Sequence, residues 1–278
     1  MKIRLLGPSF LLILCAAHTA IAASGPPYYL ALGDSLAQGV QWSLTGDIIT
    51  SSGYADDLFA QFSNTIPGLT LAKLGCPGET SSSMISGGVC QNYSQGTSQL
   101  DAAVSFLETH QVAFVTLDIG ANDVDGCISS TGVDTSCVQA GFSSVGSNLP
   151  WIIRQLRNAA GPRTPIIAMN YYDPFLSVWT LGSTGQAIAL QSLEAATEFN
   201  LILGTIYAVF GIPVADVAHA FHTYNLLPEP GENLPVDVFA VLSWTWMTAP
   251  PPYGPDIHPN TAGYAVIAAA FAQKIVLR

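Results

Sequence analysis

The segment "YYLALGDSLAQGV", residues 28–40, is the most informative part of the sequence, because it runs from an apolar strand directly into a small polar turn. Residues 28–32 have the pattern of a short buried strand, and Gly33-Asp34-Ser35 ends it before a helix-like segment. A serine at the tip of a buried strand is either the cap of the next helix or a nucleophile held toward a substrate. The rest of the chain has to distinguish these two interpretations.

Strand-like and helix-like patterns alternate through the remainder of the sequence. Further strands are predicted at 69–74, 112–119, 165–169 and 213–217, and helices at 54–62, 98–107, 138–160, 186–210 and 260–276. Such alternation is typical of βαβ units, and therefore of an α/β protein whose parallel sheet carries helices on both faces. The proline-rich segment 226–255 is expected to be a long functional loop.

The first residues have the composition of a secretory signal peptide. Lys2 and Arg4 precede an apolar stretch at 11–17, and Ala20-Ile21-Ala22 offers small residues for cleavage. We therefore expect residues 1–22 to be removed from an exported protein, and residues 23–278 to form one domain. No later stretch resembles a transmembrane helix.

The charge balance excludes one large class of partner. The formal net charge is −11 and only 10% of residues are charged. Nucleic-acid binding requires a basic footprint, so we expect no nucleic-acid partner. The remaining acids, Asp125 and Asp134 among them, are expected to contribute surface charge. We expect a monomer.

Four cysteines follow the predicted signal peptide: Cys76, Cys90, Cys127 and Cys137. An even number in an exported chain indicates disulfides, with three possible connectivities. The local pairs Cys76–Cys90 and Cys127–Cys137 are favoured, since each would staple one loop. Zinc is disfavoured because no C-x-x-C occurs.

Polar turns follow the first three predicted strands: Ser35, then "GCPGET" at 75–80, then "GAND" at 120–123. Ligands of an open parallel sheet bind outside the carboxyl ends of its strands, so these turns should meet at one edge. His258, before the last helix, can take the proton of Ser35. The backbone N–H groups of Ser35 and Gly78 and the side-chain amide of Asn122 can stabilise an oxyanion.

The blocks "LGDSLAQG", "AKLGCPGETS", "DIGANDV" and "DIHPNTAGY" stand in this order along the chain. In them the chain resembles the SGNH, or GDSL, hydrolase superfamily. The resemblance implies a flavodoxin-like three-layer α/β/α sandwich with a central five-stranded parallel sheet. It also implies ester hydrolysis without a metal or cofactor, with Ser35 as nucleophile, His258 as base, and Gly78 and Asn122 as oxyanion donors.

The last block departs from the family pattern. The family usually places an acid three residues before the histidine, where this chain has Pro255, and Asp256 stands two residues before His258. Either the Asp256 side chain or a backbone carbonyl of residue 255 or 256 then orients the imidazole. Whichever group it is would set the tautomer and stabilise the imidazolium.

These observations predict a secreted serine esterase or lipase acting on a small-molecule, lipid or polysaccharide ester. A carbohydrate acetylesterase, a phospholipase or thioesterase, and an inactive binding protein on the same fold are the alternatives. Trp244, Trp246 and Tyr253 in segment 226–255 either line a substrate pocket or pack within the protein. His219 and His222 are interpreted as loop histidines, because no third metal ligand is evident nearby.

Overall fold

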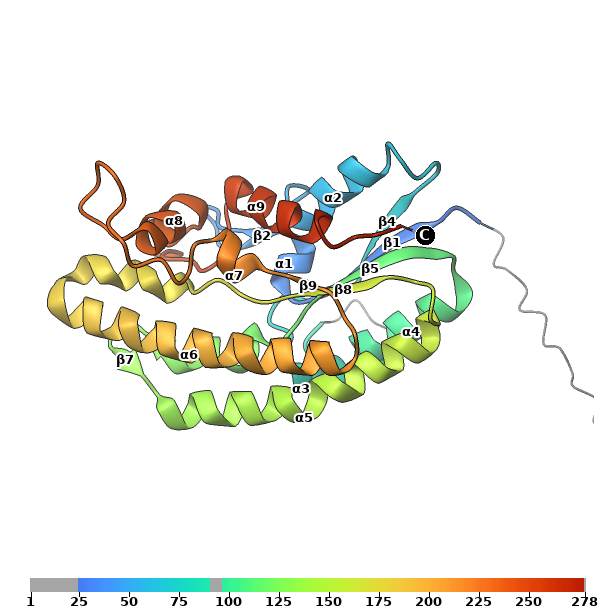
Figure 1. Ribbon diagram of the computed structural model, residues 1–278, viewed down its shortest axis with the longest axis horizontal. Coiled ribbons are helices and arrows are strands. Elements are labelled where there is room, and N and C mark those ends of the chain that lie inside the picture. The colour runs from blue at the N-terminus through green and yellow to red at the C-terminus, as the bar shows by residue number, and fades with distance from the viewer. Residues whose placement is uncertain (1–24, 91–96, 278) are drawn as a thin grey trace, which may run out of the picture.

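Five parallel strands form the central sheet of the protein, as the computed structural model shows (Figure 1). Their spatial order is β4 (Thr70–Lys73), β1 (Tyr28–Gly33), β5 (Val112–Asp118), β8 (Ile166–Met169) and β9 (Val214–Ala215). This sheet confirms the predicted fold class. The structure describes residues 25–90 and 97–277, and the predicted signal peptide at 1–22 lies outside them.

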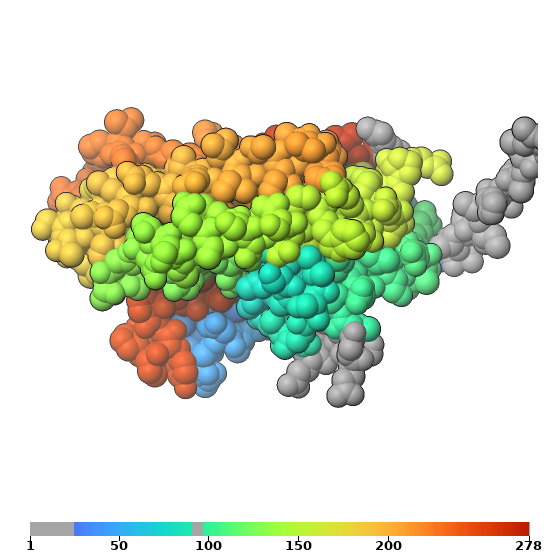
Figure 2. Space-filling view, turned by 90° about the horizontal axis from the view of Figure 1, so that it is seen from below, coloured from blue at the N-terminus to red at the C-terminus, as the bar shows by residue number. Residues whose placement is uncertain are grey.

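The central strands β1 and β5 are apolar almost throughout because both of their faces are covered. Helices α3 (Ser81–Ser86), α4 (Gln99–Thr109), α5 (Thr135–Ala160) and α6 (Gly182–Val209) lie on one face. Helices α2 (Tyr54–Phe62), α7 (Val217–Ala220), α8 (Val236–Trp244) and α9 (Thr261–Ala272) lie on the other. The long helices α5 and α6 run side by side across the surface seen in Figure 2.

Local capping explains where several helices begin. Helix α4 starts at a capping box between Ser98 and Asp101, and α9 starts where the Asn260 side chain accepts two backbone N–H groups. Helix α5 begins at Thr135, three residues before the predicted start, because the Asp134 side chain caps it.

Segment 226–255, expected to be a loop, contains the helix α8. Its Val238 and Val241 pack against a second apolar cluster that includes Leu176 and Val178 of the 3-10 helix η3 (Pro174–Leu181). This tertiary packing stabilises a short apolar helix that has no amphipathic pattern of its own. The remaining short elements lie near the ends of the sheet strands. They are the helix α1 (Ser35–Gln38) and the 3-10 turns η1 (Ala121–Asp123) and η2 (Asp125–Cys127). Two hairpins pair β2 (Val40–Gln41) with β3 (Ile48–Ile49) and β6 (Ile128–Ser129) with β7 (Gly132–Val133).

The structure pairs Cys76 with Cys90 and Cys127 with Cys137, the local connectivity favoured above, with Cα atoms 5.8 and 5.5 Å apart. The first disulfide closes the loop after β4, and the second ties η2 to the start of α5. None of the helices within the described ranges is long and apolar enough to cross a membrane.

Candidate active site

Ser35 is the first residue of α1, and only Asp34, the N-cap of this helix, separates it from the end of β1. Gly33 has φ of +134°, and a Cβ there would lie 1.8 Å from the carbonyl oxygen of Asp118, so only glycine fits where β1 ends against β5. The backbone N–H of Asp34 donates to that same carbonyl at 3.1 Å. The Asp118 carboxylate accepts the Ala37 N–H at 3.1 Å, so the neighbouring strand holds both sides of the nucleophile turn.

The buried side chain of Gln99 supports the turn that carries Ser35. Gly33 donates its N–H to Oε1 of Gln99 at 2.7 Å, and Nε2 of Gln99 donates to the Gly33 carbonyl at 2.8 Å. The same Nε2 lies 3.0 Å from a carboxylate oxygen of the buried Glu79. One side chain therefore connects the nucleophile turn with the loop that follows β4.

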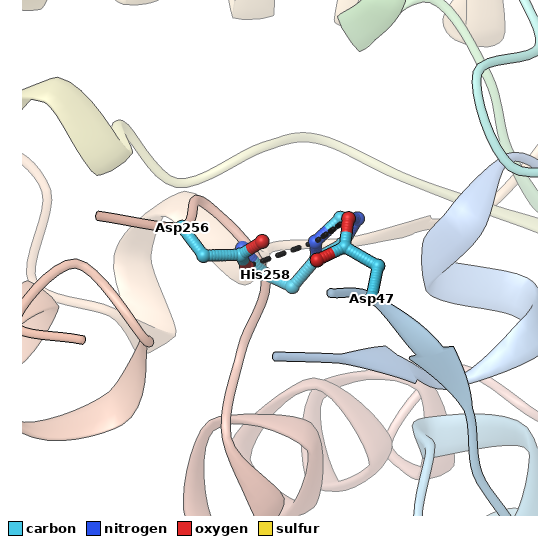
Figure 3. A group of neighbouring side chains, drawn as sticks. All are labelled: Asp47, Asp256 and His258. Atoms are coloured by element: carbon cyan, nitrogen blue, oxygen red, sulfur yellow. Dashed lines mark hydrogen bonds and ion pairs between the residues drawn. The ribbon is translucent and has the colours of Figure 1, made fainter. Parts of the chain in front are cut away.

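His258 lies against Ser35 on the loop before α9. Its Nε2 is 2.9 Å from the Ser35 Oγ, and its Nδ1 is 2.9 Å from Oδ1 of Asp256 (Figure 3). The same Oδ1 accepts the backbone N–H of His258 at 2.8 Å. In this geometry the Asp256 side chain, not a backbone carbonyl, faces Nδ1.

The surroundings of the imidazole are acidic. Burial lowers the pKa of His258, but the hydrogen bond to Asp256 and the negative charges of Asp256, Asp47 and Asp34 outweigh it and raise the pKa above 6.5. Burial raises the pKa of Asp256, but its hydrogen bond to His258 and the charge of that residue bring it below the usual 3.8. With a proton on Nδ1 facing Asp256, Nε2 is the basic nitrogen that faces Ser35.

The predicted oxyanion donors lie at the same cavity as Ser35. Gly78 has φ of +81° in the turn after β4, and Asn122 lies in η1 after β5. Within the described ranges, the backbone N–H groups of Ser35 and Gly78 donate to no protein acceptor. The Asn122 amide donates one hydrogen to the Glu79 carbonyl at 3.0 Å, which leaves its second hydrogen for a ligand.

The cavity beside Ser35 has a volume of about 500 Å³. Its walls are mostly apolar and come from α5, α6 and η3, with Phe142, Phe199 and Phe175 as their largest side chains. Asp125, expected at the surface, also lines this cavity. The phenylalanines were not found from the sequence, because apolar residues at helical spacing look the same whether they fill a core or line a cavity.

A model of the GDSL-like lipase/acylhydrolase family matches residues 31–266. The chain belongs to this family. Phospholipase A1 from Streptomyces albidoflavus has a similar fold, with a TM-score of 0.58 and 20% identity over 90% of this chain and 100% of that one. An extracellular lipase from Streptomyces rimosus is also similar, with a TM-score of 0.55 and 18% identity over 89% of this chain and 99% of that one. At these identities the likeness shows the fold, and no curated protein sequence matches the chain.

The three aromatic residues predicted to contact substrate are not among the described residues that line the cavity of this GDSL-family hydrolase. Nε1 of Trp246 donates to Oε1 of Gln41 at 3.3 Å, and its ring packs on Trp42. Trp244 packs edge-on against Phe221. Tyr253 is half exposed.

Asp47 was not found from the sequence, since it belongs to none of the four blocks. Oxygens of Asp47 and Asp256 and a ring nitrogen of His258 lie within 4.8 Å of one another, the one group in the described part of the chain that could supply three metal-ligand atoms. His219 and His222 belong to no such group. Because His258 contacts Ser35, we interpret the group as part of the catalytic machinery.

Proposed function

We propose that the protein is a secreted serine esterase or lipase that hydrolyses carboxylic esters through an acyl-enzyme on Ser35. The observation that carries this proposal is the 2.9 Å contact between the Ser35 Oγ and the His258 Nε2 at the wall of a largely apolar cavity. A nucleophile within hydrogen-bond reach of a base, itself oriented by a third group, is the arrangement that acyl transfer requires.

The reaction follows from the position of each group. His258 removes the proton of Ser35 as its oxygen attacks the ester carbonyl, and the N–H groups of Ser35 and Gly78 with the Asn122 amide stabilise the oxyanion. Asp256 stabilises the imidazolium, which then protonates the leaving alcohol. Water, deprotonated by the same imidazole, hydrolyses the acyl-enzyme and releases the acid.

The lining of the cavity favours particular substrates. Its apolar walls and its volume of about 500 Å³ favour an acyl chain longer than acetyl. The described lining includes the carboxyl groups of Asp34, Asp47, Asp125 and Asp173, and no lysine or arginine that could pair with an anion. A neutral ester therefore suits the site better than an anionic one.

Secretion is supported by the predicted signal peptide and by two disulfides, which persist in oxidising compartments. The rival carbohydrate acetylesterase would have used the tryptophans of segment 226–255 as a sugar platform. Trp244 and Trp246 pack on other aromatic side chains instead, so the longer acyl ester is the first substrate to test.

The test is hydrolysis of p-nitrophenyl esters from acetyl to palmitoyl by residues 23–278 and by the Ser35→Ala variant. We expect turnover with an optimum beyond acetyl, and a loss on the order of a millionfold in Ser35→Ala. Activity confined to acetyl esters would favour the acetylesterase. Inactivity toward every ester, together with no covalent adduct from a fluorophosphonate, would favour the binding protein.

A further inference from the structure

The imidazole of His258 faces two carboxylates, and the mechanism above uses only one. Oδ2 of Asp47 lies 3.8 Å from Nδ1 of His258, the same nitrogen that Asp256 contacts at 2.9 Å. Figure 3 shows both acids at the Nδ1 edge of the ring, Asp256 from its own loop and Asp47 from beside β3. They are more than 200 positions apart in the chain, so only the fold brings them together.

The segment before Asp47 is a hydrogen-bonded turn. Ser43 and Gly46 exchange backbone hydrogen bonds at 3.2 Å, and the Ser43 hydroxyl donates to the Gly46 carbonyl. After Asp47, strand β3 pairs with β2, and the Thr50 hydroxyl donates to the Gly39 carbonyl at 2.7 Å, directly behind α1. The hairpin that carries Asp47 is therefore anchored to the same short helix that carries Ser35.

The position of Asp256 explains why a second acid has a role. Because it stands two residues before His258, its Oδ1 accepts both the backbone N–H and Nδ1 of that residue. That one oxygen therefore serves both a loop contact and the imidazole. Asp47 makes no such backbone contact with His258, but its carboxyl lies against that of Asp256. Burial and this neighbouring acid raise the pKa of Asp47, so its negative charge acts on the ring above that pKa.

We propose that Asp47 is a positioning residue for His258, a second carboxylate that holds the Nδ1 side of the ring and stabilises the imidazolium during acyl transfer. This inference rests on the proposed function. At 3.8 Å the Asp47 carboxylate is too far from Nδ1 for a hydrogen bond, so its contribution is electrostatic.

Substrate binding should strengthen this interaction. The Asp47 side chain is 48% exposed in the free protein, and its neighbours Ile48 and Ile49 line the cavity and are themselves exposed. An ester that covers these isoleucines would remove water from Asp47, and charges attract more strongly as water is excluded. Asp47 therefore contributes more in the enzyme–substrate complex than in the free enzyme.

In the part of the chain that the structure describes, the charged groups that most affect the pKa of His258 are acids, and the control variants have to account for this. Asp256 and Asp47 face Nδ1, and Asp34 and Asp125 act from the side of the nucleophile and the cavity. Any lost negative charge could in principle shift the titration of the imidazole. Asp57→Asn on α2 is the matched control, because it removes one half-buried aspartate that exerts no such effect on His258.

The test compares Asp47→Asn, Asp47→Glu and Asp57→Asn with wild type by NMR titration of the His258 imidazole and by kcat and KM against pH. We expect Asp47→Asn to lower the pKa of His258 and to reduce kcat about fivefold above that pKa, the effect of one unit charge about 4 Å away in water. The acid limb of kcat, which reports the complex, should move further than that of kcat/KM. Asp47→Glu should recover most of the loss, and Asp57→Asn should match wild type.

An unchanged His258 titration in Asp47→Asn would overturn the inference. So would a rise in KM at constant kcat, which would make Asp47 a substrate contact. The titration needs no substrate. If wild type hydrolyses no ester, the proposed function fails, while the NMR result still decides whether Asp47 acts on His258.

Discussion

The nucleophile and the base of this site are held in different ways. Ser35 stands on a turn whose supports, Asp118 and Gln99, are fully buried and bond to its backbone. His258 stands on a loop beside two acids that are nearer to solvent, Asp256 on the same loop and the half-exposed Asp47 on the β2–β3 hairpin. The loop is tied by backbone bonds, in which Asp256 donates to the Trp246 carbonyl and Trp246 donates to the His258 carbonyl.

This difference predicts how mutations act on the two sides. Removing a support of Ser35 leaves buried backbone groups without partners, which costs stability as well as activity. Asparagine in place of an acid beside His258 removes the charge but keeps an oxygen that can accept the His258 N–H, so we expect the fold to remain intact. We therefore expect mutations on the nucleophile side to lower stability and activity together, and neutralising mutations on the base side to lower activity alone.

The largest effect after loss of Ser35 itself should come from Asp256→Asn. The amide cannot stabilise the imidazolium and can favour the wrong tautomer, so we expect kcat to fall on the order of ten-thousandfold. The thermal midpoint should change little, because Asp256 supports a loop outside the sheet. Steady-state kinetics and calorimetry on the same preparation would test both parts. A variant that loses its fold would contradict the division between the two sides.

Asn122→Ala tests the oxyanion donor that lies between the two sides. Loss of one such donor typically costs about 2.7–4 kcal/mol, or a hundredfold to a thousandfold in kcat. Asn148→Ala is the matched control: Asn148 donates to the hydroxyls of Ser81 and Ser82, close to Glu79, but does not line the cavity. Equal losses in both variants would indicate that Asn122 only holds the loop.

Gln99→Ala should damage stability and activity together. It leaves the buried N–H of Gly33 without its partner, at about 1–3 kcal/mol, while the Gly33 carbonyl still accepts the Cys76 N–H at 3.0 Å. We expect the free energy of unfolding to fall by about 1–3 kcal/mol and kcat to fall about tenfold. Gln61→Ala, on the exposed side of α2, should stay within about 0.5 kcal/mol of wild type in urea unfolding. Full stability in Gln99→Ala would break the comparison.

The last prediction concerns pH: stability should fall as pH rises, while activity should increase. Burial and the charges of Asp34 and Asp173 raise the pKa of Asp125 to about 8, and burial raises that of Asp173 to about 7. The folded protein therefore binds these protons more tightly than the unfolded chain, and the free energy of unfolding falls as pH rises through this range. The raised pKa of His258 acts in the same direction.

Catalysis has the opposite dependence, because His258 must be neutral to accept the Ser35 proton. We expect a lower thermal midpoint at pH 8 than at pH 5, while kcat/KM rises between them. In Asp125→Asn the thermal midpoint should fall less between pH 5 and pH 8, while the acid limb of the kcat/KM profile should move little. A midpoint that rises toward pH 8 would show that these acids are ionised in the folded state.

Much of the architecture could be predicted because local patterns set it. The apolar runs at β1 and β5 and the caps at Ser98 and Asn260 are readable from neighbouring residues. Helix α8 was missed because it is short and apolar, and its partners in η3 lie about 60 positions away. Its stability comes from packing that no local window contains.

Local sequence patterns were enough to predict the strand–helix alternation, the parallel sheet, and the strand ends at which Ser35, Gly78 and Asn122 share one edge. The tertiary structure alone decided that the Asp256 side chain faces Nδ1, that phenylalanines rather than Trp244 and Trp246 line the cavity, and that Asp47 reaches His258. The two kinds of feature depend on interactions at different separations along the chain. Periodicity and turn chemistry act over a few residues, whereas the direction of a side chain depends on what the rest of the chain packs against it.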